Sequence, residues 1–138
     1  MVVPAMPATL VIYCQLQMLV YCARLSRDEF VGTTSGYPYI EARGDIPGAR
    51  WGCVGNERDV NRPSDFHNPD GTMKTRGEIC DFWRKAGIHA DRQTAFYYST
   101  GWRASLAFFY AWLMNWERVS VYDGGSYEWR SDPGNPRA

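Results

Sequence analysis

The stretch from Thr94 to Trp116 places the strongest constraint on how this chain can fold. Its first five residues, Thr94–Tyr98, are mostly apolar or aromatic, which is typical of a buried strand. Ser99–Trp102 has the composition of a tight turn, and Arg103–Trp116 predicts a helix with apolar residues on all its faces. Because a helix of that kind is normally buried, we expect this strand and helix to form the centre of an α/β domain.

Segments on either side repeat the alternation of strand and helix. Thr75 and Glu78 have the spacing of a capping box, so a helix is predicted to begin there and to end at Gly87. The same spacing predicts one helical turn over Ser26–Phe30, and short strands are expected at Leu19–Ala23, Ala49–Trp51 and Val119–Tyr122. Strands that alternate with helices favour a parallel sheet with helices on both faces.

The charge balance argues against a protein that grips nucleic acid through its phosphates. Fifteen Lys and Arg are matched by fifteen Asp and Glu, which gives a formal net charge of zero. The 138 residues, 45% of them hydrophobic, are enough for one domain with a substantial core. Any charged site must therefore be local.

Apolar and cysteine patterns indicate a cytoplasmic domain without a membrane span. The longest apolar stretch, Leu10–Ala23, contains two glutamines and is shorter than the roughly 20 residues that cross a bilayer. No basic residue precedes Arg24, so the charged start of a secretory signal is missing. The four cysteines form no Cys-x-x-Cys pair, and His67 and His89 are isolated, so we expect no metal and no cofactor. Disulfides remain a less favoured alternative.

The turn after Tyr98 is the candidate site. In open α/β sheets, ligands bind where a strand leads into the next helix, and the free N–H groups of a helix start attract anions. Arg103 adds a full positive charge, Gly101 allows a close backbone approach, and Ser99 and Thr100 offer hydroxyls. The alternative is that Ser99 and Thr100 merely cap the helix while Arg103 pairs with a structural carboxylate.

Three runs of residues occur in a distinctive order and spacing. They are Ala-Arg-Gly-Asp-Ile-Pro-Gly-Ala from Ala42, Phe-Tyr-Tyr-Ser-Thr-Gly-Trp-Arg-Ala-Ser from Phe96, and Val-Ser-Val-Tyr-Asp-Gly-Gly from Val119. Together they resemble a rhodanese domain, most closely the catalytic domain of tandem thiosulfate and 3-mercaptopyruvate sulfurtransferases. The resemblance implies a five-stranded parallel sheet flanked by helices over residues 19–132. Residues 1–18 are then a leader or an extra strand, and residues 133–138 are a tail. The Arg-Gly-Asp tripeptide reads as a structural turn before a strand.

The same resemblance places a substitution at the reactive position. The family's loop runs Cys-Gly-Thr-Gly-Trp-Arg, so Tyr98 stands where the nucleophilic cysteine is expected and Ser99 stands at the glycine. Thr100, Gly101, Trp102 and Arg103 match the family. An aromatic residue usually follows the paired glycines, but this chain has Ser126, and Cys22-Ala-Arg24 keeps only the arginine of the family's Asp-x-Arg.

These features predict a rhodanese-like module that binds a small sulfur-containing anion such as thiosulfate but lacks the persulfide cysteine. A protein partner for such a module is unidentified. The alternatives are a reaction that uses Tyr98, Ser99 or another cysteine, and a thiosulfate or 3-mercaptopyruvate sulfurtransferase whose loop aligns differently. A phosphatase-like activity is disfavoured because it also needs a thiolate. We expect the Tyr98 ring to point inward and fill the space beside Arg103.

Overall fold

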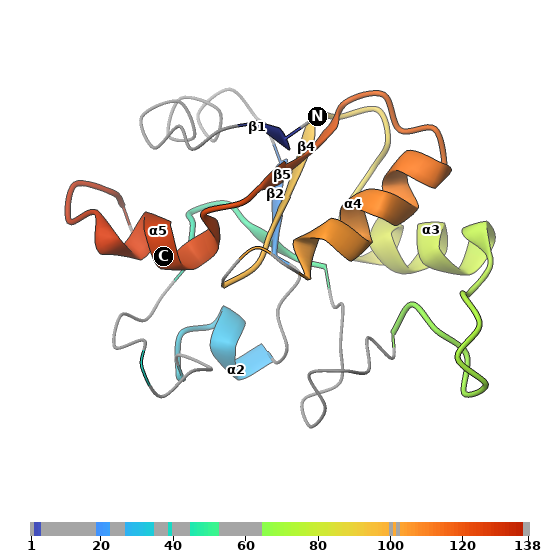
Figure 1. Ribbon diagram of the computed structural model, residues 1–138, viewed down its shortest axis with the longest axis horizontal. Coiled ribbons are helices and arrows are strands. Elements are labelled where there is room, and N and C mark those ends of the chain that lie inside the picture. The colour runs from blue at the N-terminus through green and yellow to red at the C-terminus, as the bar shows by residue number, and fades with distance from the viewer. Residues whose placement is uncertain are drawn as a thin grey trace.

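The chain forms one sheet with helices around it in the computed structural model (Figure 1). The structure describes residues 2–3, 19–22, 27–34, 39, 45–52, 65–99, 101 and 103–136. Within this described part of the chain, no helix is long and apolar enough to cross a membrane.

The sheet contains five short strands that are all paired in parallel. Its order is β1-β5-β4-β2-β3, with β4 and β5 near the centre. The strands are β1 (Val2–Val3), β2 (Leu19–Cys22), β3 (Arg50–Trp51), β4 (Thr94–Tyr97) and β5 (Val119–Tyr122). Strands were expected at the last four of these positions, and the α/β class is confirmed. Val2–Val3 adds an edge strand beside β5, so this pair follows the extra-strand alternative rather than a loose leader.

Side chains of β4 alternate between two apolar clusters on opposite faces of the sheet, as the period of two in a strand requires. Phe96 and Tyr98 pack among residues of α3 (Arg76–Lys85) and α4 (Ala104–Leu113). Tyr97 packs on the other face with Trp129 of α5 (Gly125–Ser131). A short helix, α2 (Arg27–Phe30), lies between β2 and β3 in the chain, and Figure 1 shows α3 and α4 on the side of the sheet opposite α5. Helices therefore cover both faces.

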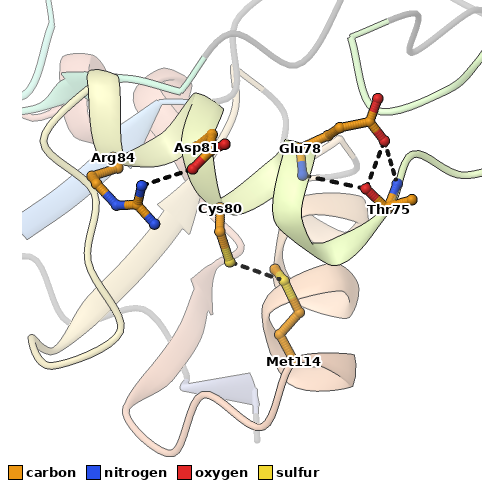
Figure 2. Close-up of polar contacts among 6 residues, drawn as sticks. All are labelled: Thr75, Glu78, Cys80, Asp81, Arg84 and Met114. Carbon is orange, nitrogen blue, oxygen red and sulfur yellow. Dashed lines mark hydrogen bonds and ion pairs between the residues drawn. The ribbon is translucent and has the colours of Figure 1, made fainter.

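The helix α3 has the ends that its sequence predicts. The Thr75 backbone N–H donates to Glu78 Oε2 at 2.9 Å and the Glu78 N–H donates to Thr75 Oγ1 at 3.4 Å, which is the expected capping box (Figure 2). At the other end Gly87 has φ 77°. Its N–H donates to the carbonyl of Arg84, and the next N–H donates to the carbonyl of Trp83, so the helix closes with a Schellman motif.

The helix α4 differs from its prediction at its end and on its surface. It ends at Leu113 rather than Trp116 because Asn115 adopts φ 60° and the Trp116 N–H donates to the carbonyl of Ala111. The expectation that the whole helix is buried is wrong, since Phe109, Trp112 and Leu113 are 47%, 57% and 48% exposed. The buried face of this helix consists of three alanines, Ala104, Ala107 and Ala111, together with Tyr110.

The helix α3 contacts the residue that follows α4 through a pair of sulfur atoms. Cys80 Sγ lies 3.6 Å from Met114 Sδ, just after the C-terminal end of α4 (Figure 2). Cys80 is a free, partly buried thiol. Met114 is 6% exposed, so this contact belongs to the apolar cluster that also surrounds Tyr98.

Candidate anion site at the carboxyl edge of the sheet

The loop from β4 to α4 lies against the start of α5. The Ser126 N–H donates to the carbonyl of Tyr98, and the Tyr127 N–H donates to the carbonyl of Ser99, both at 3.1 Å. Because parallel strands end at the same edge, the loops that follow the central strands β4 and β5 are brought together here. Of the six predicted site residues, Tyr98, Ser99, Gly101 and Arg103 are therefore placed at this edge. The other two, Thr100 and Trp102, lie outside the described residues.

Two glycines allow the β4–α4 loop and the segment that leads from β5 into α5 to pack in close contact. Gly101 has φ 87°, and a Cβ there would lie 2.5 Å from the carbonyl oxygen of Asp123. Gly125 has φ 58°, and its Cβ would lie only 1.8 Å from the carbonyl oxygen of Tyr98. Both the backbone conformation and the lack of space require glycine. The close approach that the sequence predicted at Gly101 is thus confirmed, and Gly125 has the same role on the facing loop.

The described side chains of this loop are buried. Tyr98 is 0% exposed and belongs to the α3–α4 cluster, so the inward orientation predicted for its ring is confirmed. Arg103 is 4% exposed, and its Cζ lies 5.6 Å from the centre of the Tyr98 ring, which is the geometry of a cation–π contact. A buried guanidinium beside an aromatic face keeps a positive charge at the base of the loop.

Ser99 does not cap the following helix. Its side chain is 1% exposed, and its Oγ has no hydrogen-bond partner among the described residues. The N-cap position of α4 is Arg103, where no side chain closes the helix end. The capping alternative is therefore wrong for Ser99. A buried hydroxyl without a partner is costly, so it is expected to be kept where a ligand can satisfy it.

Two buried polar pairs that the sequence did not predict lie next to this loop. The Tyr97 hydroxyl donates to Asp45 Oδ1 at 2.6 Å, and this carboxylate also accepts the Ile46 N–H at 2.9 Å. Asp45 thus fixes the turn that leads to β3, as expected for a structural Arg-Gly-Asp run. On the other side the guanidinium of Arg130 donates to Ser126 Oγ at 2.8 Å. The i, i+4 spacing of Ser126 and Arg130 was the one signal in the sequence that could have revealed this pair.

An open surface depression of about 360 Å³ lies along α5 and is lined by Asp123, Gly124, Tyr127, Glu128 and Ser131. Beneath it the buried Tyr122 hydroxyl donates to Glu128 Oε1 at 3.1 Å. Burial and the negative charge of Glu128 raise the pKa of Tyr122 well above its usual value. This tyrosine therefore stays a neutral donor and holds Glu128 against the sheet.

Neither histidine forms part of a metal cluster in the described residues. His67 Nε2 lies 3.1 Å from the hydroxyl of Tyr110, and His89 is exposed. Groups of three or more His, Cys, Asp or Glu side chains that could hold a metal ion do not occur in the part of the chain that the structure describes.

Comparison with protein families assigns this architecture. The model of the rhodanese-like domain matches residues 23–132, which is most of the chain. The chain belongs to the rhodanese-like domain family. The position of the β4–α4 loop described above is thus a feature of a rhodanese-like domain, and the family resemblance inferred from the three sequence runs is confirmed.

Two curated proteins show how this rhodanese-like domain relates to longer chains. It is 56% identical over 110 residues to thiosulfate sulfurtransferase YnjE of Escherichia coli, covering 80% of this chain and 25% of that protein. It is 32% identical over 119 residues to a putative thiosulfate sulfurtransferase of Haloferax volcanii, covering 80% of this chain and 37% of that protein. The chain therefore spans only a quarter to little more than a third of these relatives.

Solved structures agree with the fold. The crystal structure of YnjE superposes with a TM-score of 0.80 at 52% identity, over 88% of this chain and 28% of that one. A variant of EanB that carries a cysteine persulfide, in a tetrahedral intermediate state with ergothioneine, superposes with a TM-score of 0.76 at 45% identity. That match covers 86% of this chain and 27% of EanB.

Proposed function

We propose that this rhodanese-like domain binds a small sulfur-containing oxyanion such as thiosulfate at the β4–α4 loop but does not form a persulfide. The domain extends over residues 19–132 in this proposal. The described loop side chains in the proposed site are Tyr98, Ser99 and Arg103, with Gly101 supplying the backbone conformation. Thr100 and Trp102 are included on the sequence resemblance alone.

The hydrogen bonds that the loop carbonyls already accept support an anion, rather than a cation, as the ligand. The carbonyl of Tyr98 accepts from Ser126 and more weakly from Gly101, that of Ser99 accepts from Tyr127, and that of Gly101 accepts from Ala104. These three acceptors are occupied, whereas the buried Ser99 hydroxyl has no hydrogen-bond partner among the described residues and can donate to a ligand. The positive charge of the buried Arg103 and the start of α4 favour an anion as that ligand.

The missing persulfide follows from the chemistry of residue 98. A sulfane sulfur can be carried by a cysteine thiolate, because sulfur forms the S–S bond and the thiolate is accessible near neutral pH. A tyrosine phenol has a pKa near 10 and its oxygen cannot form a persulfide. The EanB variant contains a persulfide on a cysteine. Aligning the Thr-Gly-Trp-Arg run with the family's loop puts Tyr98 at that cysteine.

A cyanide-dependent thiocyanate assay tests the absence of sulfur transfer. We expect no turnover of thiosulfate by the natural chain and gain of measurable turnover in the double variant Tyr98→Cys, Ser99→Gly. Cys80→Ser is the matched control, because it removes a partly buried thiol outside the loop. Turnover by the natural chain would refute the proposal, and its loss in Cys80→Ser would assign the chemistry to that cysteine.

Calorimetry with thiosulfate and sulfate tests the anion site. We expect weak binding that falls as salt is added, since salt screens the charge of Arg103 and of the helix start. Arg103→Lys should weaken it while keeping a buried cation, and Arg84→Ala should not change it because Arg84 is an exposed residue of α3 that pairs with Asp81. Binding that is absent or insensitive to Arg103→Lys would contradict an anion site at this loop.

The second candidate function is sulfur transfer itself. It is favoured by the two relatives described above, a thiosulfate sulfurtransferase and a putative thiosulfate sulfurtransferase. It requires a nucleophile other than the phenol of Tyr98, and a thiol is the group that suits this chemistry. The same thiocyanate assay separates the two functions, because only a sulfurtransferase produces thiocyanate through many turnovers.

A further inference from the structure

The surface depression along α5 begins directly beside the β4–α4 loop. Two of the residues that line it contact the loop backbone. The Tyr127 N–H donates to the carbonyl of Ser99 at 3.1 Å. Asp123 lies so close to Gly101 that a Cβ at Gly101 would be 2.9 Å from Asp123 Oδ1. A ligand held at the loop therefore has the depression next to it.

The walls of the depression carry negative charge and one aromatic ring. Asp123 is exposed, Glu128 is partly exposed, and the ring of Tyr127 is 51% exposed. None of the five described residues that line the depression is basic. Carboxylate oxygens accept hydrogen bonds from an ammonium group, and an aromatic face attracts the same cation. The depression thus has the chemistry of a site for an organic cation.

The carboxylate of Glu128 is already held at this wall. Its Oε1 accepts a hydrogen bond from the Tyr122 hydroxyl at 3.1 Å. Its Oε2 packs over Gly124, where a Cβ would lie only 2.4 Å from that oxygen. A side chain that is fixed before binding loses little conformational freedom when it binds a cation.

An independent observation points to a ligand at this place. The Ser99 hydroxyl is 1% exposed and has no hydrogen-bond partner among the described residues. A buried hydroxyl of this kind is costly unless a ligand satisfies it. Because the carbonyl of Ser99 is bonded to Tyr127 of the depression, the loop and the depression form one continuous site.

We propose, on the basis of the anion site proposed above, that the ligand of this domain is zwitterionic. A sulfur-containing oxyanion binds at the loop with Ser99 and Arg103, and a short organic link joins it to an ammonium group in the depression. Asp123, Tyr127 and Glu128 bind that ammonium group. The substrate class is then an amino-organosulfur compound, such as an aminoalkyl thiosulfate, rather than an inorganic anion.

A metal ion fits the depression less well than an organic cation does. Ca²⁺ takes six to eight oxygen ligands, whereas only two carboxylates line the depression. No group of three or more His, Cys, Asp or Glu side chains suited to a metal occurs within the described part of the chain. The half-exposed ring of Tyr127 offers a metal ion no ligand, but it does attract an ammonium group.

Calorimetry of the full chain with two matched probes tests the proposal. S-aminoethyl thiosulfate and S-ethyl thiosulfate share the sulfur-containing anion and differ in the ammonium group. We expect S-aminoethyl thiosulfate to bind about three- to tenfold more tightly at low salt, since exposed ion pairs and cation–π contacts each contribute a small factor. This preference should disappear in the double variant Asp123→Asn, Glu128→Gln, while S-ethyl thiosulfate binds no more weakly than before.

Control variants make the result specific to the depression. Asp81→Asn removes an exposed carboxylate that pairs with Arg84 on α3, and it should leave the preference unchanged. Far-UV circular dichroism checks that each variant is folded. Tyr127→Leu, which removes the aromatic face and keeps both carboxylates, should reduce the preference about twofold and replaces the double variant if that one does not fold.

The outcomes separate this proposal from the anion site on which it rests. Equal affinities for the two probes, or a preference that survives in the depression variants, would refute the ammonium site and leave the anion site standing. Failure of both probes and of thiosulfate to bind would refute the anion site and this proposal together.

Discussion

Replacing Tyr98 by alanine tests how the β4–α4 loop is built. The ring is 0% exposed and packs within the cluster between the sheet and the helices α3 and α4. Burying roughly 150 Å² of aromatic surface at about 25 cal/mol/Å² contributes ~4 kcal/mol before the residual burial in the unfolded chain is subtracted. We therefore expect Tyr98→Ala to lower the free energy of unfolding by about 2–4 kcal/mol.

Urea unfolding followed by circular dichroism measures this change, and two variants control it. Tyr127→Ala truncates a tyrosine that is 51% exposed, so we expect a loss below about 1 kcal/mol. Tyr98→Phe keeps the ring and removes only the hydroxyl, so the difference between Tyr98→Phe and Tyr98→Ala isolates ring packing. A loss below about 1 kcal/mol for Tyr98→Ala would mean that the ring does not fill the space beside Arg103, and the inward orientation would be refuted.

Four further outcomes follow from the described contacts. Thr75→Ala should cost about 1 kcal/mol in urea unfolding, because it removes the N-cap of α3. Hydrogen bonds from the Thr75 hydroxyl and N–H, and to a smaller extent the charge of Lys74, hold the pKa of Glu78 in the folded chain below its usual 4.5. The Glu78 carboxylate therefore stabilises the fold above pH 4.5, and this stabilisation is lost as the pH falls through the lowered pKa of the folded chain. Plots of unfolding free energy against pH for the natural chain and for Glu78→Gln should therefore converge in acid. Gly125→Ala should prevent stable folding or cost more than about 3 kcal/mol, since its Cβ would overlap the Tyr98 carbonyl. Gly77→Ala, where a Cβ meets no atom within 4 Å in α3, should instead stabilise by about 0.5–1 kcal/mol in the same assay.

Much of the fold could be predicted because short-range signals determine it. The capping box at Thr75 and the left-handed turn at Gly87 fix the ends of α3 through contacts within a few residues, and both were predicted. The four internal strand positions were predicted from short apolar runs bounded by turn residues. The end of α4 was missed because Asn115, like glycine, can adopt the positive φ that ends a helix, although asparagine is a weaker signal for it in a sequence.

The candidate site was predictable in position but not in its side-chain environment. Strand and helix periodicity locate the turn after Tyr98, and sheet topology makes it a ligand-binding edge. The hydrogen bond from Tyr97 to Asp45 joins residues that are 52 positions apart in the sequence, so no local sequence pattern predicts it. The exposure of Phe109, Trp112 and Leu113 was missed because uniform apolar character does not tell which face of a helix meets the sheet. The buried face carries three alanines and Tyr110.

The backbone of the β4–α4 loop is held by groups that do not depend on the side chain of residue 98. The Tyr98 and Ser99 carbonyls accept from the start of α5, and Gly101 and Gly125 provide the close approach. A change of residue 98 can therefore alter the reactive group while these constraints keep the loop in place. The buried Arg103 beneath the Tyr98 ring extends this argument, because its charge is positioned by α4 rather than by the nucleophile. In the proposed function, anion binding rests on the loop backbone and Arg103, whereas sulfur transfer requires a thiol at residue 98, so the double variant Tyr98→Cys, Ser99→Gly separates the two.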